Sequence, residues 1–397
     1  MPRDNLVPAE WDRSGLPGWT YFDPELFDLE MREVFLTHWQ IAGHVSELPE
    51  PGDYICFDLG PERAVIVRGH DGELRAFHNL CRHRGARVVG QMRGRCNKAM
   101  ICPYHGWAYN LDGSLRGVAE AASFPPLDRN EWGLKPVEMD LWHGFIFLRF
   151  APGPQPPVAQ IMARYEAVIA PYRCAEMIDT GARWRDELDV NWKAVRDVDN
   201  EGYHVRAAHP GLHDLYGEDY FDEPYVGGAT RSVGAFNPGP SKLWSVRHYR
   251  AILPECDWLP ESQRRAWIYL GLFPTGVIGL YPDSVIWYRE NPVAAGQTVQ
   301  LGGVLRRADE DRRMRAARYL SGRIDRDTLR EDQMLTVWAC EATRSSAYDG
   351  VLLSDLEYGL KTFHDHLRAV LPVTRLERPP APGSMEAANA RAAAGGA

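Results

Sequence analysis

Two cysteine–histidine pairs constrain the fold of this chain more than any other feature of its 397 residues. Cys81 and His83 form the first pair, and Cys102 and His105 form the second, in the segment CRHRGARVVGQMRGRCNKAMICPYHGW. Thiolate sulfur and imidazole nitrogen are ligands for zinc, copper and iron, so two such pairs in one short segment indicate a metal centre. The local fold must therefore bring two loops together at one point.

Structural zinc and an iron–sulfur cluster are the two candidates for this centre. Zinc ligand pairs are usually spaced by about two to four residues and tend to keep cysteines and histidines in separate pairs. Here each pair mixes one cysteine with one histidine, which suits a [2Fe–2S] cluster of the Rieske type, with two thiolates on one iron and two imidazoles on the other. The motif favours the Rieske cluster, and zinc stays open as the alternative.

The residues around these pairs indicate a small antiparallel β domain at 40–150. Short strand-like runs such as GDYICFDLG and HGFIFLRF are separated by the turn dipeptides Asp71-Gly72 and Asp112-Gly113. The Pro- and Gly-rich segment APGPQPPVAQ that follows resembles a linker.

The remainder indicates an α+β domain at 151–375. Strand patterns at 265–305 precede helical patterns at about 328–345 and 354–371, an order that predicts an antiparallel sheet with covering helices. We further expect residues 1–39 to supply a helix that packs with this domain, and the low-complexity stretch 376–397 to be a mobile tail.

Composition excludes several classes of protein. A net charge of −9 without a clustered basic face argues against a nucleic-acid partner. There is no apolar run of bilayer length and no export signal, so we expect a cytoplasmic protein without a membrane partner. Seven cysteines, an odd number, argue against a disulfide framework.

A second histidine pair lies in the segment DVDNEGYHVRAAHPG, where His204 and His209 precede Pro210. A single histidine is more often a core or surface residue than a ligand. Two histidines with a carboxylate on one face of a metal, however, form the site that non-heme iron oxygenases use. Downstream of a Rieske motif, the pair therefore predicts a mononuclear iron site whose carboxylate comes from elsewhere in the chain.

The segments CRHRGARVV, CPYHGWAYNLDGSLRG, HWQIAGHVSELPEPGDYICFDLG and LWHGFIFLRFAPG resemble Rieske non-heme iron oxygenase α subunits, the aromatic-ring-hydroxylating superfamily. The likeness runs from about residue 20 to about residue 370 and is nearest to the choline, glycine betaine and carnitine monooxygenase-like branch. It implies an α+β chain made of an antiparallel β Rieske domain and a helix-grip (START-like) catalytic domain. It also assigns Cys81, His83, Cys102 and His105 to the [2Fe–2S] cluster.

The same resemblance implies the remaining site residues. His204, His209 and Asp332 would hold Fe(II), with Asp355 as the second choice for the carboxylate. Glu201 would bridge a cluster histidine of one subunit and an iron histidine of its neighbour in a homotrimer. The branch usually has Glu-Asn upstream of this bridge, whereas this chain has Asp197-Val198 and so lacks an amide there.

The resemblance further implies the terminal component of an oxygenase system that uses O2. A separate flavin and iron–sulfur reductase would supply electrons from NAD(P)H. The favoured reaction is hydroxylation or oxidative N-demethylation of a small quaternary ammonium or betaine substrate. Hydroxylation or O-demethylation of an aromatic carboxylic compound is the alternative reaction. The alternative from another functional class is a non-catalytic electron-transfer protein or a binding protein stabilised by structural zinc.

Aromatic side chains could surround a quaternary ammonium through cation–π attraction. The sequence does not choose among the candidates, which are Trp244, Tyr249, Trp267, Tyr269, Tyr281, Trp287 and Tyr288. For an aromatic carboxylate, the candidate anchors are Arg231, Arg247 and Arg289.

Overall fold

The computed structural model describes residues 6–218 and 220–395. It divides into two compact units. The β unit is Leu36–Val158, and the α+β unit combines Met1–Phe35 with Ala159–Ala397, within the described residues. The unit boundaries lie a few residues from the expected ones at 39/40 and 150/151.

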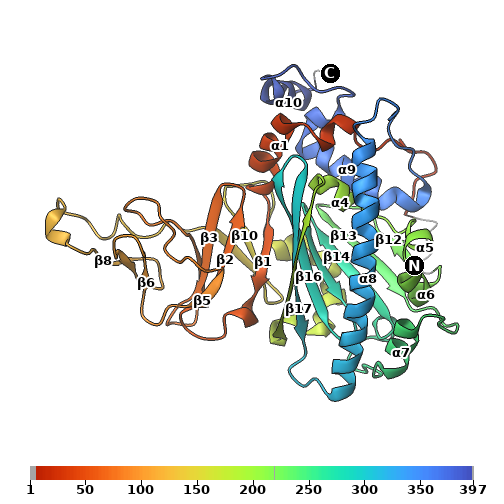
Figure 1. Cartoon of the computed structure of the whole chain (residues 1–397), viewed down its shortest axis with the longest axis horizontal. Coiled ribbons are helices and arrows are strands. Elements are labelled where there is room, and N and C mark those ends of the chain that lie inside the picture. The colour runs from red at the N-terminus through yellow and green to blue at the C-terminus, as the bar shows by residue number, and fades with distance from the viewer. Residues whose placement is uncertain (1–5, 219, 396–397) are drawn as a thin grey trace. The chain divides into compact units, whose positions relative to one another are not determined.

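The β unit contains three antiparallel sheets (Figure 1). Turn glycines with positive φ, Gly72 at 85° and Gly113 at 82°, close the two hairpins that the sequence predicted. The strands of the three sheets, in sheet order, are β1 Gln40–His44, β10 Phe145–Arg149 and β9 Glu138–Trp142; β4 Leu74–His78, β3 Glu62–Arg68, β2 Asp53–Leu59 and β5 Arg93–Arg95; and β6 Met100–Ile101, β7 Ala108–Tyr109 and β8 Leu115–Gly117.

One hydrophobic cluster of the β unit joins the strand residues to the two cysteine loops. Val65 and Val67 of β3 belong to the same cluster as Cys81, Cys102 and Trp107. Burial of this shared apolar surface stabilises the loops against the sheets. The loops are therefore fixed by the core of the unit rather than by a ligand alone.

The α+β unit is built on a seven-stranded antiparallel sheet. The strand patterns predicted at 265–305 are present, whereas the two edge-side strands at 220–235 were not predicted. In sheet order the strands are β11 Ile178–Leu188, β17 Gln297–Arg306, β16 Val285–Ala294, β15 Gly276–Leu280, β14 Ala266–Leu272, β13 Ala229–Ala235 and β12 Tyr220–Asp222.

The long helix α8, Arg312–Ala342, runs across this sheet (Figure 1). The expected helix at 328–345 is too short, because α8 begins at Arg312, where the side chain of Asp311 accepts a hydrogen bond from the Met314 N–H. The early turns contain many arginines, but Met314, Ala317 and Leu320 are buried at successive spacings of three residues. A helix crossing an antiparallel sheet confirms the predicted fold class.

Shorter helices complete the α+β unit. The segment 158–169 contains only short helical pieces. The helices are α1 Pro24–Glu30, α2 Val158–Ile161, which starts at the unit boundary, α3 Glu166–Ile169, α4 Trp192–Asp199, α5 Val205–Ala208, α6 Pro210–Tyr216, α7 Trp244–Ile252, α9 Tyr358–Val370 and α10 Met385–Ala393. Within the described residues, none of the helices is long and apolar enough to cross a membrane.

The N-terminal helix is tied to the α+β unit by a buried ion pair. Lys193 Nζ on α4 lies 2.5 Å from Glu30 Oε1 at the end of α1, and both side chains are buried. The other Glu30 oxygen accepts a hydrogen bond from Trp192 Nε1 at 2.8 Å. The helix ends earlier than expected, since Met31–Phe35 form a π-helical turn before β1.

The C-terminal segment is folded, which corrects the expectation of a mobile tail from residue 376. Met385 and Ala388 of α10 are buried, and Asn389 Oδ1 accepts a hydrogen bond from the Val373 N–H at 3.1 Å. The alanine-rich composition has a high helix propensity, and packing against α1 secures the helix. Residues 396–397 of the expected tail lie outside the described residues.

Candidate functional site

The two cysteine loops of the β unit share one backbone geometry. The Cys81 N–H donates to Ala86 O at 2.7 Å, and the Gly85 N–H donates back to Cys81 O at 2.9 Å. In the second loop the Cys102 N–H donates to Trp107 O at 2.8 Å, and the Gly106 N–H donates to Cys102 O at 3.1 Å. Gly85 and Gly106 have φ of 74° and 71°, a conformation that favours glycine.

The four ligand candidates of these loops face one another. Cys81 and Cys102 are buried, and the His83 and His105 ring centroids are 4.7 Å apart. Burial and the neighbouring His83 and Arg84 lower the pKa of His105, which favours the neutral imidazole that binds metal. His83 Nδ1 is buried without a hydrogen-bond partner among the described residues, as a ligand atom for a bound metal would be.

The spacing of these ligand atoms separates the two candidate centres. A single tetrahedral zinc binds sulfur at about 2.3 Å and nitrogen at about 2.0 Å, so its ligand atoms crowd around one point. Among the described residues, no three of the four ligand atoms here lie within 4.8 Å of one another. A cluster with two irons accommodates this wider spacing.

Hydrogen-bond donors are directed at both thiol sulfurs. The Tyr109 hydroxyl lies 3.3 Å from Cys81 Sγ and accepts the Arg82 N–H at 2.9 Å, so its own hydrogen is free to point to the sulfur. Burial raises the pKa of Cys102, while the backbone N–H groups of Tyr104 and His105 oppose this effect. Such donors stabilise negative charge on sulfur.

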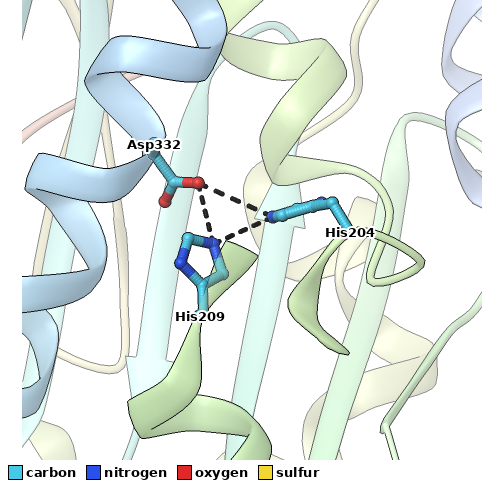
Figure 2. A group of neighbouring side chains, drawn as sticks. All are labelled: His204, His209 and Asp332. Atoms are coloured by element: carbon cyan, nitrogen blue, oxygen red, sulfur yellow. Dashed lines mark hydrogen bonds and ion pairs between the residues drawn. The ribbon is translucent and has the colours of Figure 1, made fainter. Parts of the chain in front are cut away.

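His204, His209 and Asp332 meet in the α+β unit (Figure 2). His204 precedes α5, His209 connects α5 to α6, and Asp332 projects from α8. The two Nε2 atoms are 3.0 Å apart, and Asp332 Oδ1 lies 2.9 Å from His209 Nε2 and 3.6 Å from His204 Nε2. These two nitrogens and one oxygen converge as the ligands of a single ion do.

A carboxylate holds the outer nitrogen of each imidazole. Glu201 Oε1 contacts His204 Nδ1, and Glu331 Oε2 lies 2.8 Å from His209 Nδ1. An imidazole that gives its Nδ1 hydrogen to a carboxylate presents Nε2 as a lone pair. Both rings are therefore oriented with their ligand nitrogens toward the centre.

The electrostatics of this centre suit a cation. Burial lowers the pKa of His204, but Asp332 and Glu201 outweigh it and raise the pKa to about 10. Burial raises the pKa of Asp332, and the two histidines outweigh it and lower the pKa. Asp332 Oδ1 is buried, and the two histidine Nε2 atoms are its polar neighbours among the described residues. The residues present thus fit a divalent metal ion.

Asp355 is placed elsewhere, which removes the second choice for the carboxylate. Its side chain accepts hydrogen bonds from Trp11 Nε1 at 3.1 Å and Arg13 Nη2 at 2.7 Å, at an exposed position. Its sequence position at the start of a helix, after Ser354, explains the acidic residue without any metal.

A cavity of about 520 Å³ adjoins the three metal-ligand candidates. Residues of the sheet and of α8 line it, together with His204 and His209. Val198 also lines it, so the residue that replaces the expected amide contributes apolar wall. The aromatic residues of the lining are Trp184, Tyr216, Tyr220, Tyr269, Tyr281, Tyr288 and Tyr319.

Three of the seven aromatic cage candidates, Tyr269, Tyr281 and Tyr288, line the cavity. Trp244 is exposed on α7, and the candidates that do not line the cavity also include Tyr249, Trp267 and Trp287. None of the three anchor candidates Arg231, Arg247 and Arg289 lines it either; Arg231, for example, pairs with Glu223 at 2.5 Å. Side chains alternate between the two faces of a strand, so only some of these candidates could line the cavity. The sequence did not show which ones.

Several residues of the site had no role predicted from the sequence. Glu331 lies next to Asp332 in the helix predicted at about 328–345, and the Glu-Asp pair was its only signal. Asp325 and Tyr216 line the cavity from α8 and α6, in the part of the chain that motif spacing did not reach. Their positions depend on how these helices cross the sheet.

Two family models match the chain. The Rieske [2Fe–2S] domain matches residues 38–128, and the ring hydroxylating alpha subunit (catalytic domain) matches residues 176–372. The chain therefore belongs to the Rieske-type ring-hydroxylating α subunits, and the domain pair implies a [2Fe–2S] cluster and a mononuclear iron.

Within that family, the chain is similar to oxygenase subunits named for quaternary ammonium compounds. It is 36% identical to the glycine betaine monooxygenase oxygenase subunit of Chromohalobacter salexigens over 58% of this chain and 51% of that protein. It is 31% identical to the carnitine monooxygenase oxygenase subunit of Escherichia coli K12 over 59% of this chain and 64% of that protein. The matched region thus spans about half to two thirds of these relatives.

A solved structure described as a quaternary ammonium Rieske monooxygenase has the same fold, with a TM-score of 0.76. The match covers 95% of this chain and 99% of the other, at 24% sequence identity. At this sequence identity, the similarity shows that the two proteins share a fold over both domains.

Proposed function

We propose that this chain is the terminal oxygenase component of a Rieske non-heme iron oxygenase system. The observation that carries the proposal is the convergence of His204, His209 and Asp332 at the wall of the cavity, in a chain that also holds the two cysteine–histidine loops. An electron relay that performs no chemistry would not need a second metal site with an adjoining cavity.

Cys81, His83, Cys102 and His105 would hold the [2Fe–2S] cluster, and His204, His209 and Asp332 would hold the iron. When bound, these groups supply one-electron relay and the activation of O2, respectively. Glu201 and Glu331 keep the Nδ1 hydrogens of the two iron histidines in place. Val198, Val277 and Ile286 give the cavity apolar walls that exclude water.

Electrons would come from NAD(P)H through a separate flavin and iron–sulfur reductase, as the designation "oxygenase subunit" of the relatives supports. For Glu201 we propose the bridge to a cluster histidine of a neighbouring subunit. One half of that bridge, the contact with His204, is present within the chain. The proposal includes a homotrimer located in the cytoplasm.

The favoured substrate class is a small quaternary ammonium compound or betaine, which would be hydroxylated or oxidatively N-demethylated. The names of the relatives support this class, and so do the tyrosine rings of the cavity. An aromatic compound is the second candidate, favoured by the arginines Arg315, Arg318 and Arg326 of the lining, which could attract a carboxylate.

His204→Ala tests the oxygenase assignment. We expect product formation to be abolished while the visible and EPR spectra of the Rieske cluster stay unchanged, because His204 belongs to the other unit of the chain. Turnover should be followed by mass spectrometry of products from a panel of betaines and aromatic acids with a surrogate reductase. Product formation by the variant would contradict the iron assignment.

A further inference from the structure

A chain of hydroxyl groups along the cavity ends on one carboxylate. The Tyr216 and Tyr269 hydroxyl oxygens are 3.4 Å apart, and those of Tyr269 and Tyr281 are 2.9 Å apart. The Tyr281 hydroxyl then donates to Asp325 Oδ1 at 3.0 Å. All four residues line the cavity. The hydrogen bond from Tyr281 uses only Oδ1 of Asp325, which leaves Oδ2 for a ligand.

The rings of Tyr269 and Tyr281 are nearly perpendicular to each other at this end of the cavity. The Tyr269 and Tyr281 ring centroids are 5.8 Å apart with an interplanar angle of 82°. One face of Tyr281 stacks on Trp267 at 4.0 Å, and Trp267 does not line the cavity. Trp267 covers one face of Tyr281, so a ligand can meet only the opposite face or the edge of this ring.

Asp325 has one acid and one base among its charged neighbours. The acid, Asp283, is buried and accepts hydrogen bonds from Ser284 at 3.0 Å and Ser321 at 2.7 Å. The positive neighbour, Arg326, is exposed on α8. The ionisable groups that face Asp325 from each packed element are Tyr216 of α6, Tyr249 of α7, Tyr269 of β14, Tyr281 and Asp283 after β15, and Arg326 of α8.

From this arrangement we propose that Asp325, Tyr269 and Tyr281 form the subsite for the methylated ammonium group of the substrate, with Asp325 as its counter-ion. The inference rests on the proposed function for the existence of a substrate and names the residues that recognise it. A carboxylate distinguishes this subsite from a purely aromatic cage, since it makes the subsite select for charge as well as shape.

The subsite is separated from the metal-ligand candidates along one helix face. Asp325 and Asp332 are seven residues apart on α8, which is two turns and about 10 Å along the helix axis. This separation leaves room for the ammonium group to lie between Asp325 and the metal-ligand candidates. A methyl group on the bound nitrogen can then point toward His204 and His209, as N-demethylation requires.

Binding of a cation should release a proton at this subsite. Burial, and to a lesser extent Asp283, raise the pKa of Asp325 to about 8, while Tyr281 and Arg326 lower it less. At pH 7 the empty subsite therefore holds a mostly protonated carboxyl group. A bound ammonium favours the carboxylate, so the proton leaves to solvent.

The test measures binding of choline and of its neutral isostere 3,3-dimethylbutan-1-ol to the metal-loaded protein by calorimetry, at pH 7 and without reductase. Buffers with different ionisation enthalpies report the number of protons released. For the unaltered protein we expect choline to bind roughly tenfold or more tightly than the alcohol and to release close to one proton.

Asp325→Asn should bind choline roughly tenfold more weakly without proton release, and should bind the alcohol as before. Tyr281→Phe, which keeps the ring, should retain tighter binding of choline than of the alcohol. Asp327→Asn on the exposed side of α8 is the matched control and should behave like the unaltered protein.

Equal affinity of the unaltered protein for choline and the alcohol would overturn the proposal, and so would absence of choline binding. Unchanged proton release in Asp325→Asn would also overturn it. A misfolded variant is recognised by an altered far-ultraviolet circular dichroism spectrum, because the Rieske spectrum reports on the other unit. In that case proton release by the unaltered protein decides, and its absence would overturn the proposal. No electron donor is present, so the result is independent of oxygenation; a failure of the proposed function would appear instead as absence of product in the turnover assay.

Discussion

Glu331 and His209 are joined by a contact of 2.8 Å between Oε2 and Nδ1, while Asp332, the next residue of α8, lies 2.9 Å from Nε2 of the same ring. Two consecutive residues of one helix thus hold both nitrogens of one imidazole. The first fixes the hydrogen on Nδ1, and the second shares the metal position with Nε2.

Removal of the Glu331 carboxylate should weaken iron binding. We expect Glu331→Ala to lower iron affinity by about 10- to 100-fold, as is typical for the loss of a partner of a metal-bound histidine. Glu331→Gln keeps an acceptor for the Nδ1 hydrogen and should restore much of this affinity. Iron retained against a chelator is the measurement, and Glu341→Gln on the same helix is the control. Equal iron retention in all variants would show that Glu331 does not position His209.

The choice between the two candidate acids can be tested by metal content. Asp332→Ala should lose the mononuclear iron, because it removes one of three ligands, and should keep both cluster irons. Asp355→Ala should keep all of the iron, because its side chain bonds Trp11 and Arg13. Iron per chain, determined after reconstitution, decides between them; loss of iron only in Asp355→Ala would reverse the assignment.

The Tyr109 hydroxyl should raise the reduction potential of the cluster. Its hydrogen bond to Cys81 Sγ stabilises the more negative, reduced state. A net hydrogen bond of about 0.5–1.5 kcal/mol corresponds to roughly 20–60 mV for one electron. Tyr109→Phe should therefore lower the potential by this amount in a spectroscopic redox titration. An unchanged potential with an intact Rieske spectrum would contradict the role of the hydroxyl.

The raised pKa of Asp325 makes the stability of the α+β unit depend on pH. The pKa rises from 3.8 to about 8 because the group is buried, so the unfolded chain loses its proton first. The stability associated with Asp325 is fully present below about pH 4 and is lost as the pH rises through about 8. Asp325→Asn lacks this loss and should be more stable than the unaltered protein at pH 9, on the order of 2 kcal/mol, but not at pH 4.

Thermal unfolding at both pH values measures this difference. The metal loading must be matched between the two proteins, because bound metal stabilises the folded state. Asp327→Asn serves again as the control. A parallel pH dependence in Asp325→Asn and the unaltered protein would contradict the predicted linkage.

The buried ion pair between Lys193 and Glu30 predicts a large effect on stability. Lys193→Met leaves the Glu30 carboxylate buried without its positive partner, which should cost about 3–5 kcal/mol of unfolding free energy. Addition of Glu30→Gln should recover part of this loss, since it removes the unpaired charge. Urea unfolding of the single and double variants measures both steps, and a loss below 1 kcal/mol, within the usual range for exposed pairs, would refute the expectation.

Local sequence determined those parts of the protein that depend on short-range chemistry. Cys81, His83, Cys102 and His105 are recognisable because a metal cluster requires these ligand types, and the glycines beside them follow from the tight loops. His204 and His209 are separated by one short helix and are recognisable for the same reason. Hairpin turns such as Asp71-Gly72 likewise depend on local backbone conformation.

Other features depend on contacts between segments far apart in the chain. Glu331 and Asp325 become site residues only because α8 crosses the sheet with one face toward α5, α6 and β14. The tail from residue 376 folds because α1 offers it a surface, and the choice of Tyr269 and Tyr281 over Tyr249 and Trp267 follows from which side of the sheet faces α8. Composition and spacing describe what a side chain can bind, whereas the packing of helices on the sheet decides which side chains meet.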